Sequence, residues 1–186
     1  SFHTGFNFTM PTPFSRHPFE FAVGFRKTFY LFPIAYALTI IAINVDNPNL
    51  GIFAMLLVFV ISMSYYTKPE NEYYVWVHAL RPAGFLFNKL KLAARNFLLL
   101  NLPVLVSLLI FFPQEYRLML IFFLVGFLFM MTIILAKYSA YPQEMNIPKG
   151  ILIAFSIYFP PFLLVLIPLF YLKSVKKLKV FLDDQN

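Results

Sequence analysis

Five segments of the sequence are apolar and contain no charged side chain. They comprise residues 28–45, 50–66, 96–112, 118–136 and 151–172, and each is 17 to 22 residues long. A helix rises about 1.5 Å per residue, so ~20 such residues cross a bilayer core of about 30 Å. A charge at mid-membrane costs roughly 2.5–3.5 kcal/mol, which is why membrane spans lack charges. We therefore predict an all-α fold, a polytopic transmembrane helical bundle with about five membrane segments.

The composition agrees with a membrane location. The chain has 186 residues, of which 60% are hydrophobic and 12% are charged, whereas typical soluble domains carry about 25% charged residues. A soluble fold of this size has too little interior to bury five such segments. Many aromatic residues stand near the segment ends, as expected for rings at the headgroup layer. We therefore expect the lipid bilayer to surround most of the chain.

Lysine and arginine residues predict the orientation of the chain. They number 15 and give a formal net charge of +7. Because they flank the apolar segments instead of forming one surface, they favour cytoplasmic loops beside anionic lipid and argue against nucleic acid as a partner. Five full spans would put ten of the 15 on the side that carries the N-terminus and the connector 67–95. This bias predicts a cytoplasmic N-terminus, and we expect a bacterial cytoplasmic (inner) membrane.

The same pattern divides the chain into three parts. Residues 1–27 are expected to form a cytoplasmic lead-in that ends in an interfacial helix, since Pro18 suits a first helical position and apolar residues follow at helical spacing. Residues 28–172 form the transmembrane domain, which includes the cytoplasmic connector. Residues 173–186 form a basic C-terminal tail with four lysines.

The basic tail fits this topology poorly, because five full spans would place it outside. The last segment, 151–172, contains Pro160, Pro161 and Pro168, and each proline removes a backbone donor. A kinked full span is the simpler interpretation, since membrane helices often contain proline. A re-entrant turn at Pro160 and Pro161 is an alternative that returns the tail to the cytoplasm. A further span upstream of this chain would also change the side of the tail.

The connector 67–95 is predicted to contain an amphipathic helix that begins near Glu70. Its apolar residues recur at i, i+3, i+4 and i+7, which is the spacing of one helix face. A Pro-Ala-Gly run beginning at Pro82 ends this helix, and the next helix is expected to start near Phe85 and to continue into the third span. The apolar stripe of the connector helix consists of Tyr73, Trp76, Val77 and Leu80.

This layout resembles the permease subunits of the type-2 exporters among the ATP-binding-cassette transporters. In that family a short intracellular helix between the second and third spans docks on the ATPase partner. Leu-Pro, an apolar stretch and a lysine commonly follow it, and Leu80, Pro82 and Lys89 occupy similar places here. This chain has Asn88 where the family commonly has glycine, and we find five segments where the family commonly has six.

The resemblance implies a separate nucleotide-binding ATPase that docks on the connector, and a homodimer of the permease. The apolar stripe would anchor the connector helix on lipid or protein, and Pro82 would end it. The polar residues that would contact the ATPase are Glu70, Glu72, His78, Arg81 and Lys89.

The sequence lacks the residue patterns that catalysis requires. Its three histidines, His3, His17 and His78, are scattered, and it has no cysteine. It contains no paired carboxylates at a useful spacing and no glycine-rich loop that would hold a phosphate. We therefore expect no enzymatic activity, no catalytic residue, no metal and no cofactor, and the chain cannot hydrolyse ATP by itself.

These observations favour a membrane-embedded permease subunit of a transporter that a separate ATPase energises. Because the spans carry no charge, an amphipathic or lipid-like cargo is more plausible than a small ion. The alternative is a non-transporting membrane scaffold or assembly subunit, whose spans simply pack against partner helices.

Overall fold

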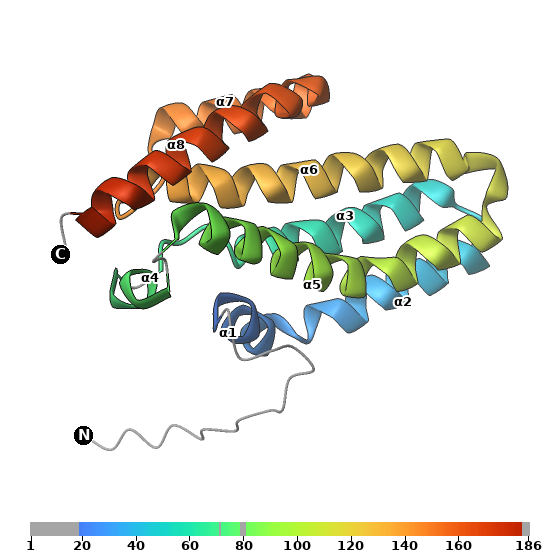
Figure 1. Cartoon of the computed structure of the whole chain (residues 1–186). Coiled ribbons are helices and arrows are strands. Elements are labelled where there is room, and N and C mark those ends of the chain that lie inside the picture. Colours follow the sequence, from blue (N-terminus) through green and yellow to red (C-terminus); the bar gives the residue numbers. More distant parts are fainter. Residues whose placement is uncertain (1–18, 71, 79–80, 184–186) are drawn as a thin grey trace, which may run out of the picture.

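The computed structural model describes residues 19–70, 72–78 and 81–183, and within these ranges every regular element is helical. This confirms the all-α fold class. The order of the elements along the chain can be followed in Figure 1. The elements are α1 (Phe19–Thr28), α2 (Leu31–Asn44), α3 (Pro48–Ser64), α4 (Glu72–His78), α5 (Pro82–Phe111), η1 (Pro113–Glu115), α6 (Tyr116–Ala140), α7 (Ile147–Tyr158), η2 (Pro160–Phe162) and α8 (Leu163–Asp183).

Two stretches of the described residues are long and apolar enough to cross a membrane. They are α5 and the continuous stretch Pro113–Ala140, which joins η1 to α6. Helices α1 and α2 would make a third span together, but the chain bends by 66° between them. Helices α3 and α7 are apolar and shorter. The structure therefore has fewer membrane-length helices than the five segments that we predicted, because α2 has only 14 residues, α3 has 17, and the last segment is interrupted by prolines.

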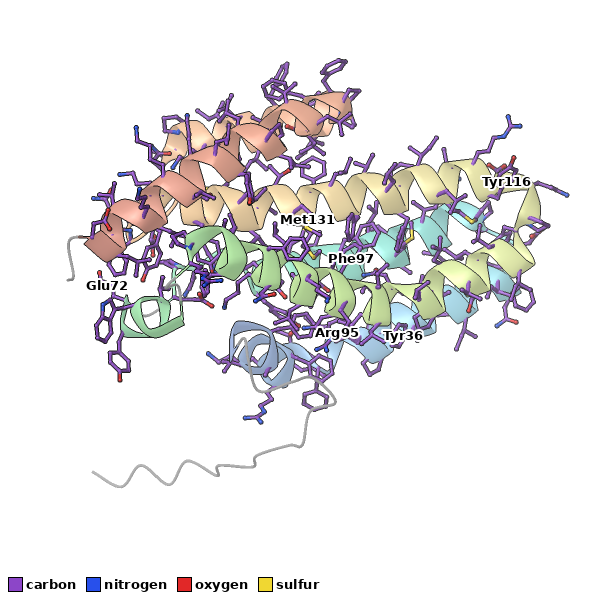
Figure 2. All side chains as sticks on the ribbon, viewed as in Figure 1. Tyr36, Glu72, Arg95, Phe97, Tyr116 and Met131 are labelled. Atoms are coloured by element: carbon purple, nitrogen blue, oxygen red, sulfur yellow. The ribbon has the colours of Figure 1, made fainter. Side chains whose placement is uncertain are left out.

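Helices α2, α3, α5 and α6 pack lengthwise around an aromatic core. The ring of Phe59 in α3 stacks on the ring of Phe97 in α5, with 4.9 Å between centroids. Helix α6 approaches closely because residue 126 is glycine, and a Cβ atom there would lie 2.2 Å from the Phe59 ring. On the other side, the hydroxyl of Tyr36 in α2 donates to the carbonyl oxygen of Leu100 at 3.0 Å (Figure 2). These contacts hold the four helices together.

The turn between α2 and α3 forms as its sequence predicts. Asp46 adopts a φ of 52°, a left-handed conformation that aspartate tolerates better than most residues. The side chain of Asn47 then accepts a hydrogen bond from the backbone N–H of Leu50 at 3.2 Å and caps α3. Pro48 occupies the first turn of the helix, where its missing N–H costs nothing. These residues close the α2–α3 hairpin.

The last predicted segment, 151–172, is not one span. Helix α7 ends at Tyr158, and the pair Pro160 and Pro161 forms the short η2 before α8 begins. Proline lacks the N–H that would continue the α7 ladder, and Pro161 keeps Pro160 out of the α region. The ring of Phe155 in α7 meets the ring of Phe162 in η2 at 5.7 Å. The helix break that we predicted at Pro160 and Pro161 is therefore present.

The direction of α8 corrects the interpretation of a kinked full span. The Ser174 hydroxyl donates to the carbonyl oxygen of Leu135 at 2.7 Å, and the ring of Phe181 meets the ring of Tyr141 at 5.1 Å. Both contacts advance along α6 and α8 in the same sense, so these helices run parallel. Helix α7 begins soon after α6 ends and runs back along it. The chain therefore reverses at η2, which makes α7 and α8 a helical hairpin beside α6 (Figure 1).

Candidate functional site

One end of the helix bundle contains a buried ion pair. The Lys89 ammonium group contacts Glu70 Oε1, and each side chain is only 6% exposed. Lys89 lies on the inward face of α5, one turn after Phe85, and its Nζ lies 5.5 Å from the centroid of the Phe85 ring. Glu70 reaches this place because the chain leaves α3 through Pro69 and passes the start of α5 before α4 begins. The pair therefore joins the connector to α5.

Two tyrosines join the same carboxylate to the end of α6. The Tyr138 hydroxyl donates to Glu70 Oε2 at 2.6 Å, and the Tyr141 hydroxyl donates to the Glu70 carbonyl oxygen at 3.4 Å. The Tyr138 ring also meets the Phe85 ring edge-on at 5.6 Å. We call Glu70, Lys89, Tyr138 and Tyr141 the Glu70 cluster. It ties the connector, α5 and α6 together at one point.

The Glu70 cluster satisfies the conditions under which a buried charge is tolerated. Removing a carboxylate from water costs several kcal/mol, and an opposite charge together with further hydrogen bonds offsets that cost. Burial, and then the negative charges of Glu72 and Glu70, raise the pKa of Tyr141 well above its ordinary value. Its phenol therefore remains protonated and remains a donor at physiological pH. Both the ion pair and the tyrosine donors stabilise this arrangement.

Helix α4 projects from this cluster and exposes two aromatic rings. Val75 is fully buried and fastens α4 to the rest of the chain. Tyr73 is 71% exposed, Trp76 is 39% exposed, and their rings meet at 6.1 Å. Glu72 is also exposed, at the same end of the molecule in Figure 2. Both rings lie at the surface, and their contact with a lipid or protein partner stays a prediction.

The structure corrects the expected roles of two polar residues. We expected Glu70 and Lys89 to contact the ATPase partner, but they contact each other inside the chain. The reason is that the connector folds back between the ends of α5 and α6, where an unpaired charge would be costly. Arg81 is exposed and precedes α5, and Pro82 occupies the first turn of that helix. Val77 and His78 belong to α4, but their side chains, and the whole of Leu80, lie outside the described residues.

The sequence analysis missed Tyr138 and Tyr141, which we assigned to the interfacial belt. Their i, i+3 spacing at a helix end was a usable signal, because it places both hydroxyls on one face. The side chain of Glu70, which lies in the connector before α4, is buried, whereas Glu72 opens α4 and is exposed. Among the described residues, no group of three or more His, Cys, Asp or Glu side chains could hold a metal ion.

Comparisons of the chain with protein-family models, with curated proteins and with solved structures found no match. The features of this chain that bear on its function are therefore the Glu70 cluster, α4 and the arrangement of the apolar helices.

Proposed function

We propose that this chain is a membrane-embedded permease subunit of a transporter, and that a separate nucleotide-binding ATPase docks on α4 to energise it. One combination of features carries the proposal. Helix α4 exposes an aromatic pair, Tyr73 and Trp76, and a buried ion pair lies where the connector that leads into α4 meets the bundle. Tryptophan and tyrosine are enriched among the residues that dominate protein interfaces. A surface helix that binds no partner would not need a buried ion pair to attach it to the bundle.

The Glu70 cluster supports a role in transmitting force. Glu70 precedes α4 directly, and its carboxylate contacts Lys89 of α5 and Tyr138 of α6. A displacement of α4 by a partner therefore acts on both membrane-length helices at once. Coupling of this kind requires packed side chains and hydrogen bonds that connect the two sites without interruption, and the cluster provides them.

The apolar helices support a membrane arrangement with one re-entrant hairpin. In this arrangement α5 and α6 cross the bilayer, α2 and α3 form a shorter hairpin beside them, and α7 and α8 enter and leave on the same side. Helix α1 bends away from α2 by 66° and carries the exposed Arg26 and Lys27, as suits a helix lying in the headgroup layer. The hairpin puts the four lysines of the tail on the side of the connector, so 14 of the 15 basic residues share that side. This distribution favours a cytoplasmic N-terminus in a bacterial inner membrane.

The polar side chains between the helices of the bundle support the proposal of an amphipathic or lipid-like cargo. Four buried polar side chains in the bundle each donate a hydrogen bond to a backbone carbonyl of their own helix, one turn earlier. Such bonds allow a polar side chain to pack between apolar helices. Among the described residues of α2, α3, α5 and α6, the buried charged side chains are Lys89 in α5 and Lys137 in α6, which lie near the connector end. The four side chains and their acceptors are Thr39 with Ala35, Ser62 with Val58, Asn101 with Phe97, and Thr132 with Leu128.

The proposal is tested by crosslinking at α4. A photoreactive phenylalanine analogue at Tyr73 should crosslink a protein that contains a phosphate-binding Walker motif, identified by mass spectrometry. With that subunit co-expressed, the double variant Tyr73→Ala, Trp76→Ala should weaken its binding by ~2 kcal/mol or more, because two exposed aromatic anchors are lost. ATP hydrolysis by the complex in lipid nanodiscs should fall in parallel.

The matched control is Tyr116→Ala. Tyr116 is an exposed aromatic residue at the opposite end of the bundle (Figure 2), so binding should be unchanged. Crosslinks only to membrane proteins without a nucleotide-binding motif would contradict the permease proposal and favour the scaffold. Size-exclusion chromatography with light scattering would show whether two permease chains act together, as the resemblance implies.

A further inference from the structure

A second feature at the same end of the molecule is a pocket of about 350 Å³ between α6 and α8. Helix α8 lines it with three lysines, and α6 contributes Ser139. A fourth lysine, Lys149 at the start of α7, lies close enough that burial and then the charges of Lys173 and Lys177 lower its pKa. We call Lys173, Lys176 and Lys177 the lysine pocket, and Lys149 lies near it.

The positive charges of the lysine pocket are fixed in place by the packing of α8. Ser174 and Leu178 are fully buried against α6, so the residues beside them, Lys173 and Lys177, must face outward. Positions i, i+3 and i+4 lie on one helix face, where like charges destabilise a helix. The described lining of the pocket includes no carboxylate. An anion from outside the chain would neutralise this concentration of positive charge.

The surface beside the lysine pocket is apolar. Towards the η2 turn, α8 exposes Leu172 at 69% and Leu164 at 62%. Helix α7, on the other arm of the hairpin, exposes Ile151 at 62% and Phe155 at 54%. The pocket therefore lies at the boundary between an apolar surface and a cluster of lysine ammonium groups. A ligand that matches both has a negatively charged head and hydrocarbon chains.

We propose that the lysine pocket binds the phosphate group of an anionic membrane phospholipid, whose acyl chains lie along the exposed apolar faces of α7 and α8. Lysine binds phosphate as a mobile point charge, and basic pockets between helices on the cytoplasmic side suit such headgroups. The volume falls within the range of small-molecule sites, about 300–1,000 Å³, so it accommodates more than a bare phosphate. The inference rests on the proposed membrane location and is independent of the ATPase.

The test measures lipid binding to the purified full chain. Phosphatidylglycerol and phosphatidylcholine with identical acyl chains are titrated into detergent-solubilised protein, and retained lipid is counted by native mass spectrometry. We expect a preference of at least about tenfold for the anionic lipid. The double variant Lys173→Gln, Lys177→Gln should lose most of that preference. The control Lys68→Gln, Lys91→Gln removes two exposed lysines with the same change in net charge and should keep it.

A separate arm of the experiment identifies the source of the phosphate. Inorganic phosphate at the same concentration should neither displace the lipid nor raise the unfolding temperature as the lipid does, and equal effects would overturn the choice of lipid. An equal loss in both double variants would overturn the pocket in favour of diffuse surface charge. If Lys173→Gln, Lys177→Gln fails to fold, Lys177→Ala alone replaces it, and Lys177→Arg should retain binding. Loss of lipid preference with ATPase binding intact would separate this site from the proposed function.

Discussion

The two ends of the helix bundle are built in different ways. At one end the α2–α3 turn and η1 connect neighbouring helices, and the Asn47 cap joins residues only three apart. At the other end, Glu70 bonds to Lys89 and Tyr138, which lie 19 and 68 residues away. The first end only has to reverse the chain. The second end ties the connector, α5 and α6 together, which suits a point of attachment for a partner.

Charge separates the two ends as well. Asp46 and Glu115 line a shallow cavity of about 260 Å³ at the turn end, where Arg117 is the nearest base in the sequence. The connector end carries the exposed lysines of α8 and the basic residues of α1. In the proposed topology, this asymmetry agrees with the preference of basic residues for the cytoplasmic side. It also means that the comparison can be tested with impermeant reagents.

The largest expected effect concerns the side of the membrane on which each end lies. The chain has no cysteine, so single-cysteine variants report one position each. Lys68→Cys and Lys179→Cys should react with a membrane-impermeant maleimide from the cytoplasmic side only, because the α7–α8 hairpin returns the tail to that side. Labelling is measured in right-side-out and inverted vesicles, and the difference should be all or none.

Gln114→Cys is the matched control at the turn end, since Gln114 is exposed and lies in η1. It should label from the opposite side. If Lys179→Cys labels together with Gln114→Cys, the hairpin crosses the membrane and the re-entrant arrangement is wrong.

The next largest effect concerns the buried ion pair. Glu70→Ala leaves the Lys89 ammonium group without its carboxylate partner, and removing one member of a buried pair costs about 3–5 kcal/mol. The free energy of unfolding, measured with a denaturant in detergent micelles, should fall by that amount. Replacing both members, Glu70→Gln with Lys89→Met, should recover much of the loss, because no buried charge then remains.

Glu115→Ala provides the comparison at the turn end. Glu115 is exposed, so its removal should change the free energy of unfolding by no more than about 0.5 kcal/mol. Equal losses in Glu70→Ala and Glu115→Ala would show that the connector end is not specially stabilised.

The smallest effect tests the local bonds of the turn end. Asn47→Ala removes the side chain that caps α3, and losing such a cap costs about 1 kcal/mol. Asn47→Asp keeps an acceptor and should be nearly neutral. Thermal unfolding followed by circular dichroism is the measurement, and a loss as large as that of Glu70→Ala would contradict the comparison.

The parts of the fold that follow from local sequence were predicted well. The run from Asp46 to Asn49 determines its own turn. Helix α5 starts at Pro82, slightly before the start that we expected near Phe85, because proline suits the first turn of a helix. The bend between α1 and α2 separates the short helix that we expected to end at residue 27 from the first predicted segment, and Pro33 in the first turn of α2 is a sequence signal for that helix start. At Pro160 the break was visible in the sequence, and a reversal there was one of the open interpretations; only the packing of α8 against α6 decides between them.

The candidate site divides in the same way. The position of α4 and the exposure of Tyr73 and Trp76 follow from a helical stripe that the sequence displays. The bond between Glu70 and Tyr138 joins the connector to the end of α6, and no local pattern encodes that contact. A carboxylate in a polar connector looks like a surface residue until the fold encloses it.

Helix α5 has a mechanical consequence. It is continuous over 30 residues from Pro82 to Phe111, or roughly 45 Å at 1.5 Å per residue. That exceeds the hydrocarbon thickness of about 30 Å, so in the proposed membrane arrangement its first turns protrude beyond the lipid tails. Helix α5 contains Pro103, and a helix that pivots about an interior point moves its two ends in opposite directions. A small sideways displacement at Lys89 would therefore move the end of α5 near Phe111 in the opposite direction, towards or away from α2 and α3.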